Sequence, residues 1–98
     1  MIITYKDRKL EKICTDINVA QIAYGAEMAE RIHKRICDIS AYFSVEQLIE
    51  NHVGRCHPLK NNRKGQYAMD LVHPYRLVFE KHGEVIQLAN ILEIVDYH

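Results

Sequence analysis

The sequence predicts an α+β domain in which helices come first and a mainly antiparallel sheet follows. Before Gly54 the apolar residues recur every three or four positions, which is the spacing of one buried helix face. After Gly54 the spacing falls to two, the period of a half-buried strand. Turn residues at His73-Pro74 and at 81–84 separate the last strand candidates, as in a meander. We therefore expect three to five strands with the N-terminal helices packed on one face.

In the first half of the chain, residues 2–5 predict a short strand and residues 7–14 a short helix. Leu10, Ile13 and Cys14 share one face of that helix. A longer helix is predicted over 19–39, because one apolar stripe runs through Ile22, Ala26, Ala29, Ile32, Ile36 and Ile39. Its remaining surface is charged and includes Arg31, Lys34 and Arg35.

A third helix is predicted to begin at a capping box formed by Ser44 and Gln47 and to end near Asn51. The strand candidates that follow are 55–60, 66–72, 75–80 and 85–95. In the last strand, the expected buried face consists of Ile86, Leu88, Leu92 and Ile94.

The composition fits one domain, residues 1–98, since 48% of its 98 residues are hydrophobic and can form a core without disulfides or a structural metal. No apolar run is long enough to cross a bilayer, and the N-terminus does not resemble a signal peptide. The three cysteines, Cys14, Cys37 and Cys56, are odd in number and far apart. We expect a cytoplasmic protein with reduced thiols and no membrane association.

Positive charge is concentrated in one stretch although the net charge is zero. Residues 55–76 hold only Asp70 against five cations, Arg55, Lys60, Arg63, Lys64 and Arg76. Such a strip can attract phosphate groups whatever the total charge of the protein. The alternative is a solvated mixed surface, in which Arg76 forms an ion pair with Asp70 or Glu80.

Groups that can transfer protons lie within this basic stretch and at the end of the sequence. The chain ends in Asp96-Tyr97-His98, and a second imidazole, His57, lies between two cations. Cleavage of RNA requires loss of the 2′-hydroxyl proton and protonation of the leaving 5′-oxygen, which two imidazoles can perform near neutral pH. Asp96 could orient an imidazole, and Tyr97 could act as an acid or base or stack on a nucleobase.

Cations in the same stretch could complete such a site. Lys60 and Arg76 could stabilise the extra negative charge of the transition state. The alternatives are a surface histidine for His57 and an ordinary chain end for His98. His52, Cys56 and His57 match no zinc-ligand spacing, so we expect neither a metal nor a cofactor.

Four ordered blocks of the second half, RCHPLK at 55–60, RKGQY at 63–67, YRLVF at 75–79 and EIVDYH at 93–98, resemble the HigB branch of the RelE-like bacterial toxins. The opening residues 3–12 also look like that family's N-terminus. The resemblance matches the family's functional histidine to His57, its cations to Lys60 and Arg76, and its C-terminal catalytic group to Asp96, Tyr97 and His98. Two departures are Asn61-Asn62, where the family often has Gly-Asp, and the neutral net charge, where the family tends to be basic.

The resemblance implies a small RelE-like domain that is the toxin of a type II toxin–antitoxin system. Members of that family cleave mRNA in the decoding site of the small (30S) ribosomal subunit and are neutralised by a HigA-like helix-turn-helix antitoxin. Operator DNA would be contacted only through the antitoxin. We expect the antitoxin to contact residues 19–39, including Arg31, Lys34 and Arg35, and to block entry to the ribosome. The alternative is an inactive module of the same fold that binds an antitoxin and co-represses its operon.

Overall fold

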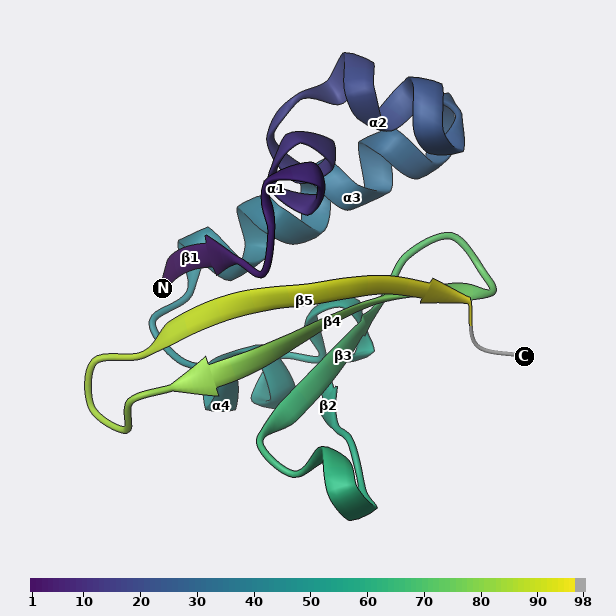
Figure 1. Ribbon diagram of the computed structural model, residues 1–98. Coiled ribbons are helices and arrows are strands. Elements are labelled where there is room, and N and C mark those ends of the chain that lie inside the picture. Colours follow the sequence, from purple (N-terminus) through teal and green to yellow (C-terminus); the bar gives the residue numbers. More distant parts are fainter. Residues whose placement is uncertain (97–98) are drawn as a thin grey trace.

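A five-stranded sheet carries a layer of helices on one of its faces in the computed structural model, which describes residues 1–96 (Figure 1). The elements in chain order are β1 (Ile2–Tyr5), α1 (Arg8–Thr15), α2 (Ile17–Tyr24), α3 (Ala26–Ala41), α4 (Val45–Glu50), β2 (His57–Pro58), β3 (Gln66–Asp70), β4 (Tyr75–His82) and β5 (Leu88–Asp96). Two short 3-10 turns, Val53–Arg55 and Asn61–Arg63, precede and follow β2. Tyr97 and His98 lie outside the described residues.

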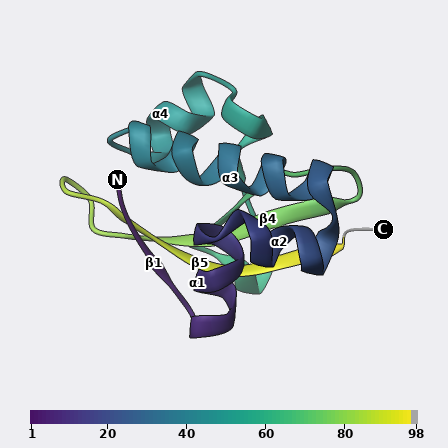
Figure 2. The same cartoon turned by 90° about the horizontal axis from the view of Figure 1, so that it is seen from above.

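The strand order across the sheet is β1-β5-β4-β3-β2. Strands β2 to β5 pair antiparallel with their neighbours, whereas β1 pairs parallel with β5. Helices α1, α2 and α3 lie over one face of the sheet, as the view from above also shows (Figure 2). The predicted α+β class with a mainly antiparallel sheet is therefore confirmed. No helix of residues 1–96 is long and apolar enough to span a membrane.

The first helix follows the prediction closely. Asp7 caps it, since its carboxylate accepts a hydrogen bond from the Leu10 amide at 2.8 Å. Leu10, Ile13 and Cys14 are all buried, as their common face predicts. Burial raises the pKa of the Cys14 thiol to about 12, so this thiol stays protonated at neutral pH.

The predicted long helix over 19–39 is wrong, because Gly25 divides it into α2 and α3. Gly25 has a φ of 88°, which residues other than glycine rarely adopt. Its amide donates to the Gln21 carbonyl at 2.8 Å and so ends α2. Ile22 is consequently 89% exposed instead of lying in the buried stripe. The apolar spacing of three and four continues across the break, so periodicity alone does not detect it.

Arg35 also differs from the prediction, because it is buried and not part of a polar helix surface. Its Nε donates to the Asp70 carbonyl at 2.6 Å, and its Nη1 lies 3.1 Å from Asp38 Oδ2. Gly54 packs against this guanidinium so closely that a Cβ there would lie 2.5 Å from Arg35 Nε. These contacts join α3 to the end of β3.

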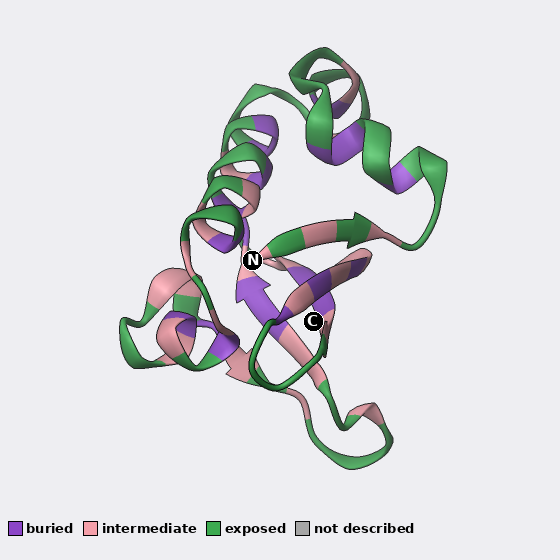
Figure 3. Ribbon diagram, turned by 90° about the vertical axis from the view of Figure 1, so that its left-hand side faces the viewer, coloured by how far each residue is buried: buried purple, intermediate pink, exposed green. Residues whose placement is uncertain are grey.

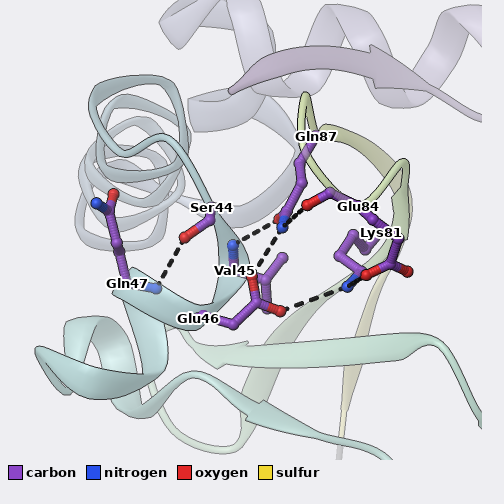
Figure 4. Close-up of polar contacts among 7 residues, drawn as sticks. All are labelled: Ser44, Val45, Glu46, Gln47, Lys81, Glu84 and Gln87. Carbon is purple, nitrogen blue, oxygen red and sulfur yellow. Dashed lines mark hydrogen bonds and ion pairs between the residues drawn. The ribbon is translucent and has the colours of Figure 1, made fainter.

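The start of α4 is fixed by a network of polar contacts (Figure 4). Ser44 Oγ accepts from the Gln47 amide at 3.1 Å, as the capping box predicts, but Gln47 Oε1 accepts from the amide of Phe43 instead of Ser44. The buried Gln87 accepts from the Val45 amide at 2.9 Å and donates to Glu46 at 2.7 Å. The segment between β4 and β5 is thereby joined to α4. This helix ends at Glu50 and is capped by Asn51, the residue near which the sequence predicts its end.

The predicted face of the last strand is only partly correct. Val78 pairs with Glu93 and Phe79 with Ile91, so a bulge in β5 leaves Leu92 without a partner in the register. Ala89, Ile91 and Ile94 therefore face the helices, and Ile86, which precedes the strand, is 84% exposed. A bulge shifts the alternation by one residue, and a period of two cannot represent that shift.

The core lies between the helices and the helix-facing side of the sheet. Met69, Leu77, Phe79 and Ile91 of the three long strands are fully buried, and they pack in one cluster with residues of α1, α3 and α4. In Figure 3 the buried residues occupy the central strands and parts of the helices, whereas the connecting loops are largely exposed.

Candidate functional site

The face of the sheet opposite α1, α2 and α3, which we call the open face, carries most of the predicted site. Residues in register on paired strands project to the same side of a sheet. One row of such residues on the open face consists of His57, Ala68, Val78 and Glu93, and the next row consists of Asp70, Arg76 and Val95. His57 and Arg76 therefore share a face although they come from different strands. Two strand spacings, about 10 Å, separate them across the sheet.

The ring of His57 has a defined orientation on β2. Its Nδ1 lies 2.8 Å from the Arg55 carbonyl oxygen. Because a carbonyl only accepts hydrogen bonds, Nδ1 carries the proton and Nε2 of the neutral ring is a proton acceptor. His57 is half-buried, and its Nε2 makes no hydrogen bond to residues 1–96. This tautomer is the one required of a general base.

Asp70 brings two of the predicted cations together. Its Oδ2 lies 2.7 Å from Arg55 Nε, and its Oδ1 lies 3.6 Å from Arg76 Nε. The sequence-based alternative of an Asp70–Arg76 ion pair is thus observed, while Glu80 contacts His82 and Asn90 instead. A hollow of about 240 Å³ adjoins the two arginines and is also lined by residues of the 71–75 turn.

The other three predicted cations lie on the loop between β2 and β3. Arg63 donates from Nε to Gln66 Oε1 at 2.8 Å and forms an ion pair with Glu93 on the open face. Lys60 and Lys64 are exposed and form no ion pair with the part of the chain that the structure describes. The basic strip is therefore divided into arginines that contact carboxylates and lysines that face solvent.

The ion pair between Glu93 and Arg63 is a feature that the sequence did not indicate. Arg63 and Glu93 are 30 positions apart, and they meet only because β5 lies next to β4 and β4 next to β3. Asp70 could be anticipated, since a turn centred at His73-Pro74 places residues 70 and 76 opposite each other.

Asp96 does not lie in the rows that contain His57 and Arg76. It is the last residue of β5, it is exposed, and it pairs in register with Tyr75, whose ring packs against Tyr24 of α2 on the helix side. Asp96 therefore does not share the open face with His57 in the strand register, and its catalytic role stays a prediction. For Tyr97 and His98, which lie outside the described residues, the catalytic assignment stays a prediction.

The residues considered as metal ligands are not arranged as a site. Among residues 1–96 no group of three or more histidine, cysteine or acidic side chains could hold a metal ion. Cys56 is buried, and this burial raises the pKa of its thiol to about 12. His52 is exposed on the preceding segment.

Two solved toxins share this fold. A YoeB/ParE toxin from Agrobacterium tumefaciens superposes with a TM-score of 0.68 at 16% sequence identity, with all of both chains covered. A YoeB dimer from Staphylococcus aureus gives a TM-score of 0.58 at 18% identity, covering 100% of this chain and 97% of the other. No family model matches the sequence, and no curated protein matches it either. The chain thus has the fold of YoeB-like toxins at a low level of sequence identity.

Proposed function

We propose that this protein is the toxin of a type II toxin–antitoxin system and acts as a ribosome-dependent endoribonuclease of the HigB kind. The observation that carries the proposal is the open face, on which the acceptor tautomer of His57 lies within two strands of Arg76. The fold shared with a YoeB/ParE toxin supports it. So do the sequence blocks that resemble HigB.

In this proposal His57 is the general base. Its Nε2 takes the proton from a 2′-hydroxyl, and the resulting oxyanion attacks the adjacent phosphorus. Arg76 offsets the charge that develops on the phosphate oxygens. The bond to the 5′-oxygen then breaks, leaving a 2′,3′-cyclic phosphate, and the leaving oxygen gains a proton. His98 is the candidate donor, and Tyr97 and Asp96 are the candidates for substrate stacking and for orienting His98.

The proposed partners are mRNA on the 30S decoding site and a HigA-like antitoxin through which operator DNA is contacted. We place the antitoxin on the exposed side of α3. Lys34 is exposed there, whereas Arg35 is buried, so charge reversal of Arg35 would test folding and not binding. Lys34→Glu should weaken antitoxin binding measured by calorimetry, and Lys34→Gln should weaken it less. Unchanged affinity in both variants contradicts this placement.

The enzyme proposal is tested by inducing the chain without a partner. Growth should stop, ribosome-bound mRNA should be cut, and His57→Ala should remove both effects while circular dichroism remains unchanged. His82→Ala is the matched control, because His82 is an exposed histidine on the same sheet whose ring forms a hydrogen bond with Glu80 and with neither Arg55 nor Arg76. Continued growth and intact mRNA with the unmodified chain would refute the enzyme.

A binding module without nuclease activity is the second candidate. It is favoured by the pairing of Arg55, Arg63 and Arg76 with carboxylates, which offsets positive charge on the open face of a neutral chain. Under this reading the protein binds its antitoxin and strengthens operator repression, but induction alone leaves growth unaffected.

A further inference from the structure

We propose that Asp70 is a positioning residue that assembles Arg55 and Arg76 into one clamp for the phosphate groups of RNA. This inference rests on the proposed function and adds Asp70 and Arg55 to its site. The two arginines are 21 positions apart in the sequence, and the Asp70 carboxylate lies between them, within 2.7 Å of Arg55 and 3.6 Å of Arg76.

The atoms involved suit a clamp. Asp70 approaches each guanidinium at Nε, one oxygen per arginine. An arginine has five N–H groups, so the contact of Asp70 with Nε of Arg55 does not occupy the terminal pair of Arg55 that can bind phosphate bidentately. The terminal nitrogens of Arg55 make no hydrogen bond to residues 1–96, and the side chain of Arg55 is 69% exposed. A phosphate can therefore reach Arg55 while Asp70 still holds it.

The position of Asp70 is itself fixed by contacts that do not involve its carboxylate. Its carbonyl accepts from Arg35 Nε at 2.6 Å, and its backbone pairs with Arg76 in the β3–β4 ladder. Removing the charge of Asp70 should consequently leave the strand in place. This separates a positioning role from a structural one.

One oxygen of Asp70 is left in an unfavourable state. Oδ1 is buried and accepts no hydrogen bond within the described chain, since Arg76 Nε at 3.6 Å lies beyond hydrogen-bonding distance. A buried acceptor without a donor costs free energy, and such groups in native proteins are often tied to function. The adjoining hollow of about 240 Å³ gives a substrate group access to the two arginines.

The clamp predicts effects of opposite sign on binding and on cleavage. Asp70 cancels one of the two positive charges, so Asp70→Asn should strengthen non-specific attraction to RNA. The same change releases both arginines from their alignment, and a misplacement of about 1 Å can slow a reaction by about 100-fold. We therefore expect Asp70→Asn to lower kcat by about 100-fold with an unchanged or lower KM.

The experiment compares Asp70→Asn with Glu80→Gln in cleavage of ribosome-bound mRNA. Glu80 lies on the same face, and its neutralisation changes the charge equally, but it contacts neither arginine. The Glu80 variant should keep the wild-type kcat, and Asp70→Glu, which restores a carboxylate, should recover part of the activity lost in Asp70→Asn. Equal kcat values for Asp70→Asn and the wild type would overturn the clamp. So would an equal loss in both neutral variants.

A second readout does not depend on cleavage. In ¹⁵N NMR spectra, the Nε–H signals of Arg55 and Arg76 should shift when inorganic phosphate is added to the wild type. In Asp70→Asn these signals should move toward those of a solvated arginine and lose the common phosphate response. If the wild type proves inactive on RNA, the proposed function fails, but this titration still decides on the clamp. Arginine signals that are identical in both proteins would refute it.

Discussion

The two faces of strands β3, β4 and β5 differ sharply in composition, although successive residues of the same strands supply them in alternation. The helix side presents Met69, Leu77, Phe79 and Ile91, all fully buried. The open face presents Asp70, Arg76, Glu80 and Glu93, with the small apolar Ala68 and Val78 between them. The same strands thus carry the core on one side and the candidate chemistry on the other.

This difference indicates that stability and activity can be altered separately. Side chains on the helix side exchange solvent for apolar contacts, which supply most of the free energy of folding. The charged side chains of the open face are partly hydrated, and exposed ion pairs of this kind contribute little to stability. Substitutions on the two faces should therefore produce distinct results.

The largest effect is expected on the open face, from His57→Ala. Removal of a general base typically slows a reaction by roughly 10²–10⁴-fold. The rate of mRNA cleavage should fall by that amount while the urea unfolding midpoint stays close to that of the wild type. Arg76→Ala should give a loss of similar size. If the variants lost cleavage activity and their urea unfolding midpoints also fell well below that of the wild type, the two faces could not be altered separately.

The next effect is expected on the helix side, from Phe79→Ala. Phe79 has no exposed surface, so its truncation leaves a cavity and should cost about 3–5 kcal/mol of unfolding free energy. Urea denaturation followed by circular dichroism measures the change. Val85→Ala is the control, because Val85 is 93% exposed and its truncation should change stability by less than about 0.5 kcal/mol.

A smaller effect should come from the polar network beside α4, which belongs to neither face. Gln87→Ala removes the acceptor of the Val45 amide and leaves that buried donor unsatisfied. The expected loss is about 1–3 kcal/mol of unfolding free energy. Gln21→Ala, at an exposed helix position, is the matched control. Equal stability of the two variants would show that the network in Figure 4 does not contribute to folding.

The smallest effect concerns pH. The hydrogen bond from Gln87, together with Lys81, lowers the pKa of Glu46 below its ordinary value of 4.5. A lowered carboxyl pKa stabilises the fold above 4.5, and this contribution is lost as the pH falls from 4.5 through the lower pKa of the folded state. Glu46→Gln should reduce the loss of stability in that range without abolishing it, since the pKa of Glu80 is lowered too, mainly by its hydrogen bond with His82. Urea midpoints measured at several pH values test this, and an identical pH dependence in both proteins would contradict it.

Local sequence signals predicted the parts of the fold that depend on neighbouring residues. Ser44 caps α4 where the capping box predicts, and α1 forms where its apolar face predicts, because both signals involve residues only three or four positions apart. The His73-Pro74 turn likewise places Asp70 opposite Arg76. The basic strip and His57 were identified from residue type and resemblance, and the strand register places His57 and Arg76 on one face.

The tertiary structure decided the features that depend on distant contacts. The burial of Arg35 requires the Asp70 carbonyl, which is 35 positions away, and the pairing of Arg63 with Glu93 requires three strands in the observed order. The bulge in β5 determines which residues of that strand face the core. Periodicity reports only whether a residue fits a helix or a strand, whereas strand order and register result from packing over the whole chain. For that reason the sequence by itself determined the class of fold and the candidate groups, and the packing determined which of those groups meet.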